Sequence, residues 1–345
     1  LNSVFVTLIL LFQPDPNNMI YSIFKKIALC VTAGALLLTG CGKKAEEAAA
    51  VTIPDAPDAA IQTVITEFTK GNGAILWQAM PASYQSDVNT LAQLAGSKID
   101  PEVYDNSFAT IARLAEIVEQ QQAFILNSSF MEDRSAEEMA ELEAALPLIV
   151  DLVEIITSSE LASTNGLLNF NGQDFFNTTV SKFVQYAETL GQLTGDESLL
   201  SDYMDAVVSV VEADNLQATL LTTVPGQEPT EQVFTKVEQR WVPSEMARNW
   251  SAKIAEVKAE FDATSIEDIA AQKPQIMGAL AMIDGVLAQI AAAENQEQFD
   301  QSLQGAMIPL MGLVMLSQGM GGGVDPIAPM PEAPIVAPSS IPAIQ

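Results

Sequence analysis

Between residues 58 and 318, apolar side chains recur every three or four positions, the spacing that places them on one face of an α-helix. Start signals support this pattern. Asp100-Pro101 joins a capping acceptor to a proline at the first helical position, and Ser135-x-x-Glu138 is a capping box. The clearest apolar stripe consists of Ile276, Leu280, Ile283, Leu287 and Ile290. We therefore predict a mostly α, multi-helix body over residues 58–318.

Other helices are predicted from similar signals. One is predicted to begin at Pro57-Asp58 and end at Gly71, and others to begin at Pro81 and at Ser244. Three more are predicted over about 175–190, 199–211 and 297–317. Pro147 is expected to kink the helix that follows the capping box. The end of the last helix, AMIPLMGLVML, is apolar on all sides, which at this length favours a buried core helix over a membrane span.

Residues 216–242 break the helical pattern and are predicted to form one small β-hairpin. LQATLLTTV is followed by PGQEPTE, whose proline and glycine indicate a turn, and then by QVFTKVEQRWV. One face of this last segment is predicted to be buried and is formed by Val233, Thr235, Val237 and Trp241. The opposite face is predicted to lie in water and carries Lys236, Glu238 and Arg240.

An export signal is predicted from Met19 onward. Two lysines precede a 12-residue apolar run over 27–38, which ends in Leu38-Thr39-Gly40-Cys41. The run is shorter than the roughly 20 residues that span a bilayer. Its last four residues resemble the lipobox of bacterial lipoproteins. The resemblance implies cleavage between Gly40 and Cys41, lipidation of Cys41 with chains such as palmitate, and attachment to a membrane through that lipid.

The segments around the body are predicted to be non-globular. Residues 1–18 precede a complete signal, so we interpret them as an upstream mis-start, with a short membrane-associated segment as the alternative. Residues 19–40 are the signal peptide, and 41–57, rich in Ala, Glu and Pro, are a lipid-anchored tether. Residues 319–345 are predicted to be a disordered tail rich in Pro and Gly.

Negative charge dominates the sequence. After removal of the signal, residues 41–345 hold 13 Lys+Arg and 43 Asp+Glu, a net charge of −30. The segment 100–231 alone has a net charge of −21, with Arg113, Arg134 and Lys182 as its basic residues. This charge argues against binding nucleic acid. We interpret it as a source of solubility, with docking of a cationic protein or a cell-wall partner as the alternative.

Most familiar catalytic chemistry is excluded by composition. The sequence has no His, and its two Cys are Cys30, removed with the signal, and Cys41. The mature chain therefore lacks the residues of Ser-His-Asp or Cys-His sites and of the usual zinc and copper centres. A pair of carboxylates that hydrolyses a glycoside remains compatible with the composition. No metal or cofactor site is predicted.

Three local patterns have a functional and a structural interpretation, and we prefer the structural one for each. Asn169, Asn171 and Asp174 place oxygen ligands around Gly172, as in part of a calcium loop, but a turn is predicted. Thioethers that bind Cu(I) elsewhere are predicted to fill the core at Met307, Met311 and Met315. Side chains that stack on sugars elsewhere are predicted to be buried at Trp77, Trp241 and Trp250.

Two further resemblances concern the body. The strand that ends in Arg240-Trp241, with the helix after it, resembles the terminal strand of small nuclear-transport-factor-like lipoproteins over about 30 residues, too little to imply a function. The body as a whole is similar to uncharacterised helical lipoproteins of diderm bacteria. With Gly rather than Asp at position 42, this implies a location at the outer membrane, facing the periplasm or the cell surface. We expect a lipid-anchored envelope protein with a non-enzymatic binding or structural role, and a carboxylate-dependent glycan hydrolase as the alternative.

Overall fold

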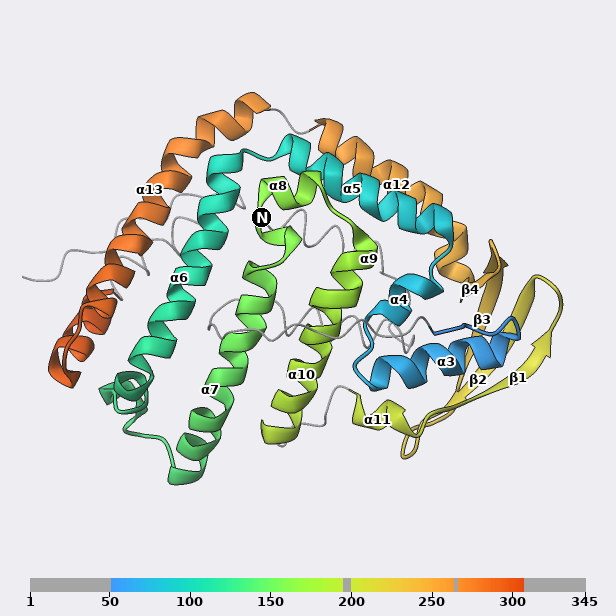
Figure 1. The fold of residues 1–345 in the computed structure, drawn as a ribbon, viewed down its shortest axis with the longest axis horizontal. Coiled ribbons are helices and arrows are strands. Elements are labelled where there is room, and N and C mark those ends of the chain that lie inside the picture. Colours follow the sequence, from blue (N-terminus) through green and yellow to red (C-terminus); the bar gives the residue numbers. More distant parts are fainter. Residues whose placement is uncertain (1–50, 195–199, 264–265, 307–345) are drawn as a thin grey trace, which may run out of the picture.

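The computed structural model describes residues 51–194, 200–263 and 266–306. These residues form a predominantly helical protein with one small antiparallel sheet at one end (Figure 1). The predicted fold class is therefore confirmed. Cys41, the signal peptide 19–40 and the predicted tail 319–345 lie outside the described residues.

The helices are α3 (Pro57–Thr69), α4 (Ala74–Ala79), α5 (Ala82–Lys98), α6 (Pro101–Leu126), α7 (Ala136–Thr157), α8 (Thr164–Leu168), α9 (Gly172–Phe175), α10 (Ser181–Thr194), α11 (Ser201–Met204), α12 (Ser244–Ala263) and α13 (Ile266–Ala291). Short turns are the 3₁₀ segments η1 (Ser129–Met131) and η2 (Glu160–Ala162) and the π-helical turn η3 (Phe176–Val180). Residues 296–306 form a further helical segment. The strands are β1 (Val207–Ala213), β2 (Gln217–Thr223), β3 (Thr230–Val237) and β4 (Arg240–Pro243).

Four long helices, α13, α6, α7 and α10, lie side by side in one layer (Figure 1). The predicted caps set where two of them begin. The Asp100 carboxylate accepts from the Val103 backbone N–H at 3.1 Å at the start of α6. At the start of α7 both bonds of the predicted capping box are present, at 3.2 and 2.7 Å. Pro147 lies inside α7, which is one uninterrupted helical segment across it.

The sheet is an antiparallel meander of strand order β1-β2-β3-β4, with α3 packed along it (Figure 1). The helix predicted over 199–211 is wrong, because α11 covers only Ser201–Met204 of it and β1 follows. The β1 sequence contains Val207, Val208, Val210 and Val211. Branching at Cβ restricts these side chains in a helix and suits a strand that pairs with β2.

The prediction of two strands over residues 216–242 is one strand short. Residues 232–242, predicted as a single strand, belong to two strands, β3 and β4. Glu238 and Gln239 have φ angles of 47° and 66°, which reverse the chain between β3 and β4. The Glu238 carboxylate accepts a hydrogen bond from the Ser83 backbone N–H at 3.0 Å, so the start of α5 holds this turn. The same bond lowers the pKa of Glu238.

The predicted faces of residues 233–241 change with this turn. Val233 was expected to be buried, but its side chain is 45% exposed, whereas Phe234 is buried. Lys236 was expected in water, but its ammonium forms an ion pair with Asp55 and lies over the ring of Trp241.

Residues 51–56, which were predicted as part of the tether, contact the body. Ile53 packs against the apolar cluster beneath the sheet, and the Asp55 carbonyl accepts a hydrogen bond from Trp241 Nε1 at 2.8 Å. The ordered body therefore includes residues before α3.

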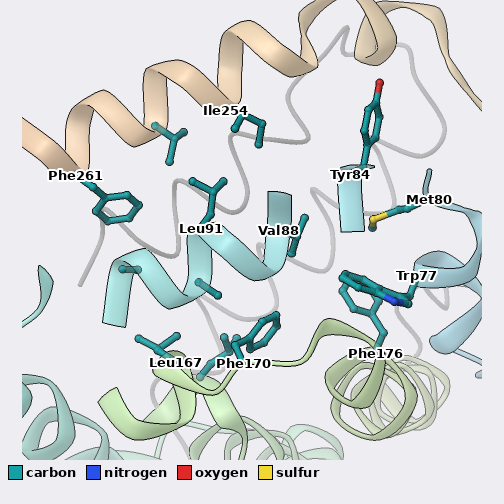
Figure 2. Packing of buried hydrophobic residues seen from close by; sticks show 14 of the residues in the cluster. Trp77, Met80, Tyr84, Val88, Leu91, Leu167, Phe170, Phe176, Ile254 and Phe261 are labelled. Atoms are coloured by element: carbon teal, nitrogen blue, oxygen red, sulfur yellow. The ribbon is translucent and has the colours of Figure 1, made fainter. Parts of the chain in front are cut away.

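The largest apolar cluster lies between α12, α5 and the segment α8–α9 (Figure 2). Trp250 of α12 stacks on Tyr84 of α5, with ring centroids 4.0 Å apart and planes at 10°. On the opposite side of α5, Leu167 and Phe170 fill the space beneath the helix, as Figure 2 shows. Helix α5 is thus a central element of the core and covers apolar residues on two sides.

Candidate functional site

A pocket of about 320 Å³ opens between the C-terminal end of α7 and the first turn of α10. Seven residues line it: Ile155, Ser158, Ser159, Glu160, Thr178, Thr179 and Lys182. All except Ile155 carry a hydroxyl group or a charge. Small-ligand pockets in proteins begin at about 300 Å³. This pocket is therefore our candidate binding site.

The Thr179 hydroxyl is the most informative group in the pocket. The residue is only 6% exposed, yet its hydroxyl forms no hydrogen bond with a described residue. Across residues 51–194, 200–263 and 266–306, no fully buried side-chain oxygen or nitrogen lacks a partner. The Thr179 oxygen is therefore accessible, and Thr179 lines the pocket. An accessible hydroxyl without a protein partner can donate to a ligand and accept from it.

The other three hydroxyls have partners of their own. Ser158 Oγ donates to the Glu154 carbonyl at 2.6 Å, and Ser159 Oγ donates to the Ile156 carbonyl at 2.7 Å. Thr178 Oγ1 donates to the Asp174 carbonyl at 2.7 Å. Ser159 Oγ also accepts from the Leu161 backbone N–H at 3.2 Å. Since the hydroxyl protons of Ser158 and Thr178 are used within their own turns, the oxygens of these two residues present lone pairs. They favour a ligand that donates hydrogen bonds.

Two opposite charges line the pocket without pairing. Neither the Lys182 ammonium nor the Glu160 carboxylate belongs to any of the ion pairs formed among the described residues. Both side chains are half-buried. By contrast, Arg113, another of the bases in the segment 100–231, pairs with Asp284 at 3.7 Å. The pocket thus contains one cation and one anion that are available to a ligand.

The π-helical turn η3 positions the α10 side of the pocket. Ser181 Oγ donates to the Phe176 carbonyl at 3.2 Å and accepts from the Gly73 backbone N–H at 2.9 Å. A Cβ atom on Gly73 would lie 2.6 Å from the Ser181 nitrogen, so glycine is needed for this close approach. The wider π turn places Phe176 in the core and Thr179 at the pocket, one turn before Lys182. Such turns often occur at functional sites.

The three tryptophans are buried, as predicted. Trp77, Trp241 and Trp250 are 5%, 7% and 3% exposed. Trp250 Nε1 donates to the Asp87 carboxylate at 2.9 Å, and Trp77 packs against Phe176 with ring centroids 5.5 Å apart. None of these rings offers a face on which a sugar would stack.

The sequence Asn169–Asp174 forms a cap at the start of α9, which agrees with the predicted turn. Asn171 Oδ1 accepts from the Gln173 backbone N–H at 3.1 Å, and Asn171 Nδ2 donates to the Asp174 carboxylate at 2.7 Å. The Gly172 backbone N–H donates to Asn89 Oδ1 at 2.8 Å. The polar side chains therefore satisfy one another and the backbone.

Several predicted site residues lie outside the described part of the chain. These are the cleavage and lipidation residues Gly40 and Cys41, and Met307, Met311 and Met315. The predicted helix 297–317 is described only as far as residue 306. Lipidation of Cys41 and the core role of these methionines thus stay predictions.

Glycoside hydrolysis requires two carboxyl groups that face each other across the substrate. Glu160 is the one carboxylate that lines the pocket. Burial raises the pKa of Asp151 on α7, and the negative charges of Glu154 and Glu119 raise it further. Asp151 does not line the pocket. The pocket therefore lacks the two facing carboxylates of a glycosidase.

Helix α13 has an uncovered apolar surface. Its stretch Ala271–Ala291 is long and apolar enough to cross a membrane, with a mean hydropathy of 1.3, and 6% of that window is buried. Of the predicted stripe, Leu287 is buried and the other members are half-buried. No other helix in the described ranges has this length and composition.

Sequence reasoning missed the pocket because its two walls are distant in the chain. One wall comes from residues 155–160 and the other from 178–182. The available signal was Lys182, one of three bases in a segment of net charge −21. Only the packing of α7 against α10 brings this lysine to Glu160.

Comparison of the chain with protein-family models, curated proteins and solved structures found no match.

Proposed function

We propose that this chain is a lipid-anchored protein of the cell envelope that binds a small polar ligand without catalysing a reaction on it. The observation that carries the binding role is the pocket between α7 and α10, with its free hydroxyl on Thr179 and its two unpaired charges. Accessible polar groups without protein partners can complete their bonding with a ligand. The lipobox around Cys41 supports the anchor.

Binding is favoured over the alternative, glycan hydrolysis, by the chemistry of the pocket wall. Hydrolysis of a glycoside uses two carboxyl groups about 5–9.5 Å apart across the scissile bond. Glu160 has no second carboxylate beside it in the pocket, and Lys182 faces the same space. A cation and hydroxyls in this position hold a ligand by hydrogen bonds and charge.

The anchor predicts that Cys41 carries lipid. Cells that express the full chain and are fed a fatty-acid analogue should label the protein, and the label should disappear in Cys41→Ser. The wild type is expected to sediment with membranes. Cys30→Ser is the matched control and should retain both properties. A labelled Cys41→Ser variant, or an unlabelled wild type, would contradict the anchor.

The pocket predicts that filling it abolishes binding. The purified protein should be screened by thermal shift against millimolar neutral sugars, carboxylic acids, amino acids and dipeptides. A bound solute stabilises the folded state. Thr178→Phe places a ring at the pocket wall and should remove the stabilisation that a solute gives to the wild type.

Thr189→Phe is the matched control for this experiment. Both threonines are exposed and donate to the carbonyl four residues earlier, at 2.7 Å for Thr178 and 2.9 Å for Thr189. Thr189 lies on α10 outside the pocket. Equal stabilisation of both variants, or no stabilisation of the wild type by any solute, would contradict the proposed binding role.

A further inference from the structure

We infer that the ligand of this pocket is a small zwitterion of amino-acid or dipeptide size, whose carboxylate contacts Lys182 and whose ammonium contacts Glu160. This inference rests on the proposed binding role and specifies the class of ligand. It is carried by the position of two opposite charges that line one pocket and do not contact each other.

The presence of both charges in one pocket selects against ligands of a single sign. An anion that pairs with Lys182 would bring its charge close to Glu160, and a cation that pairs with Glu160 would approach Lys182. A neutral sugar would leave both charges without a counter-charge. A zwitterion satisfies both in one molecule, because each of its ends meets the opposite charge.

The other groups of the pocket agree with this orientation. Thr179 lines the same pocket as Lys182, so its hydroxyl can donate to the carboxylate that Lys182 binds. Glu160 follows the C-terminal end of α7, where the helix dipole is negative and attracts an ammonium. The Ser158 oxygen at that end, whose proton is donated to the Glu154 carbonyl, presents lone pairs to the ammonium hydrogens.

Pocket size and composition limit the rest of the ligand. A volume of about 320 Å³ is at the lower end of small-molecule sites. Ile155 is the one apolar residue of the wall, which matches a small aliphatic side chain rather than a large ring. L-alanyl-L-alanine meets these conditions and is the probe we choose.

The test compares three forms of the probe on the purified full chain by calorimetry. L-alanyl-L-alanine has both charges, its N-acetyl derivative lacks the ammonium, and its C-terminal amide lacks the carboxylate. We expect the dipeptide to bind, and each blocked form to bind about 10- to 100-fold more weakly, the loss that accompanies removal of a charged hydrogen bond. Thr179→Val should lower the affinity for the dipeptide about 3- to 10-fold.

Pocket variants assign each end of the probe. Lys182→Met should lower the affinity for the dipeptide and should bind the C-terminal amide as tightly as the dipeptide. Lys182→Arg should restore part of the affinity for the dipeptide. Glu160→Gln should likewise bind the dipeptide more weakly than the wild type does, and should bind the N-acetyl derivative as tightly as the dipeptide. The Lys253–Glu256 pair on α12, at 2.7 Å, supplies matched controls away from the pocket, Lys253→Met and Glu256→Gln. Melting curves verify that every variant folds.

The outcomes separate this inference from the proposed function. If the blocked forms bind as tightly as the dipeptide, or only a neutral sugar binds and Thr178→Phe abolishes its binding, the zwitterion is overturned while the binding role stands. If the dipeptide binds but Lys182→Met and Glu160→Gln leave the three affinities unchanged, the assignment to this pocket is overturned. If no small polar solute binds the wild type, both proposals fail.

Discussion

Trp241→Ala is expected to destabilise the protein by about 3–5 kcal/mol, the usual cost of deleting a buried tryptophan. Trp241 of β4 packs in the cluster between the sheet and α3, with Ile61 and Ile65 on the helix side. Its Nε1 also donates to the Asp55 carbonyl at 2.8 Å. The variant therefore loses both the packing of Trp241 against α3 and the hydrogen bond to Asp55 in the segment before α3. Chemical denaturation of wild type and variant measures the difference.

Trp241→Phe separates the two contributions. Phenylalanine keeps most of the buried ring but does not donate to the Asp55 carbonyl. Trp241→Phe should therefore lower the free energy of unfolding by less than Trp241→Ala does. Val233→Ala is a control from the same sheet, because Val233 is 45% exposed and its truncation should change stability by roughly 0.5 kcal/mol or less. A Trp241→Ala variant as stable as the wild type would show that the ring does not pack in the core.

Local signals predicted most of the helices because those signals act within one turn. The cap at Asp100 and the capping box at Ser135–Glu138 involve residues three apart, and both form as predicted. The sheet was predicted less well. Its β3–β4 turn uses Glu238 and Gln239 in the left-handed region, where Asn and Gly are usual, and depends on a bond from Ser83, 155 residues away. No local pattern encodes such a contact.

In the candidate site, too, local features could be predicted from the sequence and long-range contacts could not. The prediction that the Asn169–Asp174 segment is a turn depended on neighbouring residues and agrees with the cap that forms there. The pocket depends on the packing of α7 against α10 and on the π turn at 176–180, which has no periodic signal in the sequence. Lys182 was visible as a base among acids, but its place in one pocket with Glu160 is a property of the fold.

Gly172→Ala is expected to destabilise the protein by about 1–3 kcal/mol through overpacking. A Cβ atom at position 172 would lie 2.2 Å from both Cη2 and Cζ3 of Trp77, far inside contact distance. Trp77 is 5% exposed and packed against Phe176, as Figure 2 shows, so the ring has little room to move. Gly172 is therefore required by the approach of an aromatic ring rather than by the geometry of a turn. Denaturation of wild type and variant measures the loss.

A second substitution tests this cause directly. Trp77→Leu removes the ring atoms that the new methyl group would strike, so Gly172→Ala should cost less in the Trp77→Leu background than in the wild type. Gly278→Ala on α13 is the control, because nothing lies within 4 Å of its Cβ position and alanine favours a helix over glycine by about 1 kcal/mol. It should leave stability unchanged or raise it. Equal costs of Gly172→Ala in the two backgrounds would mean that the loss has a source other than the Trp77 ring.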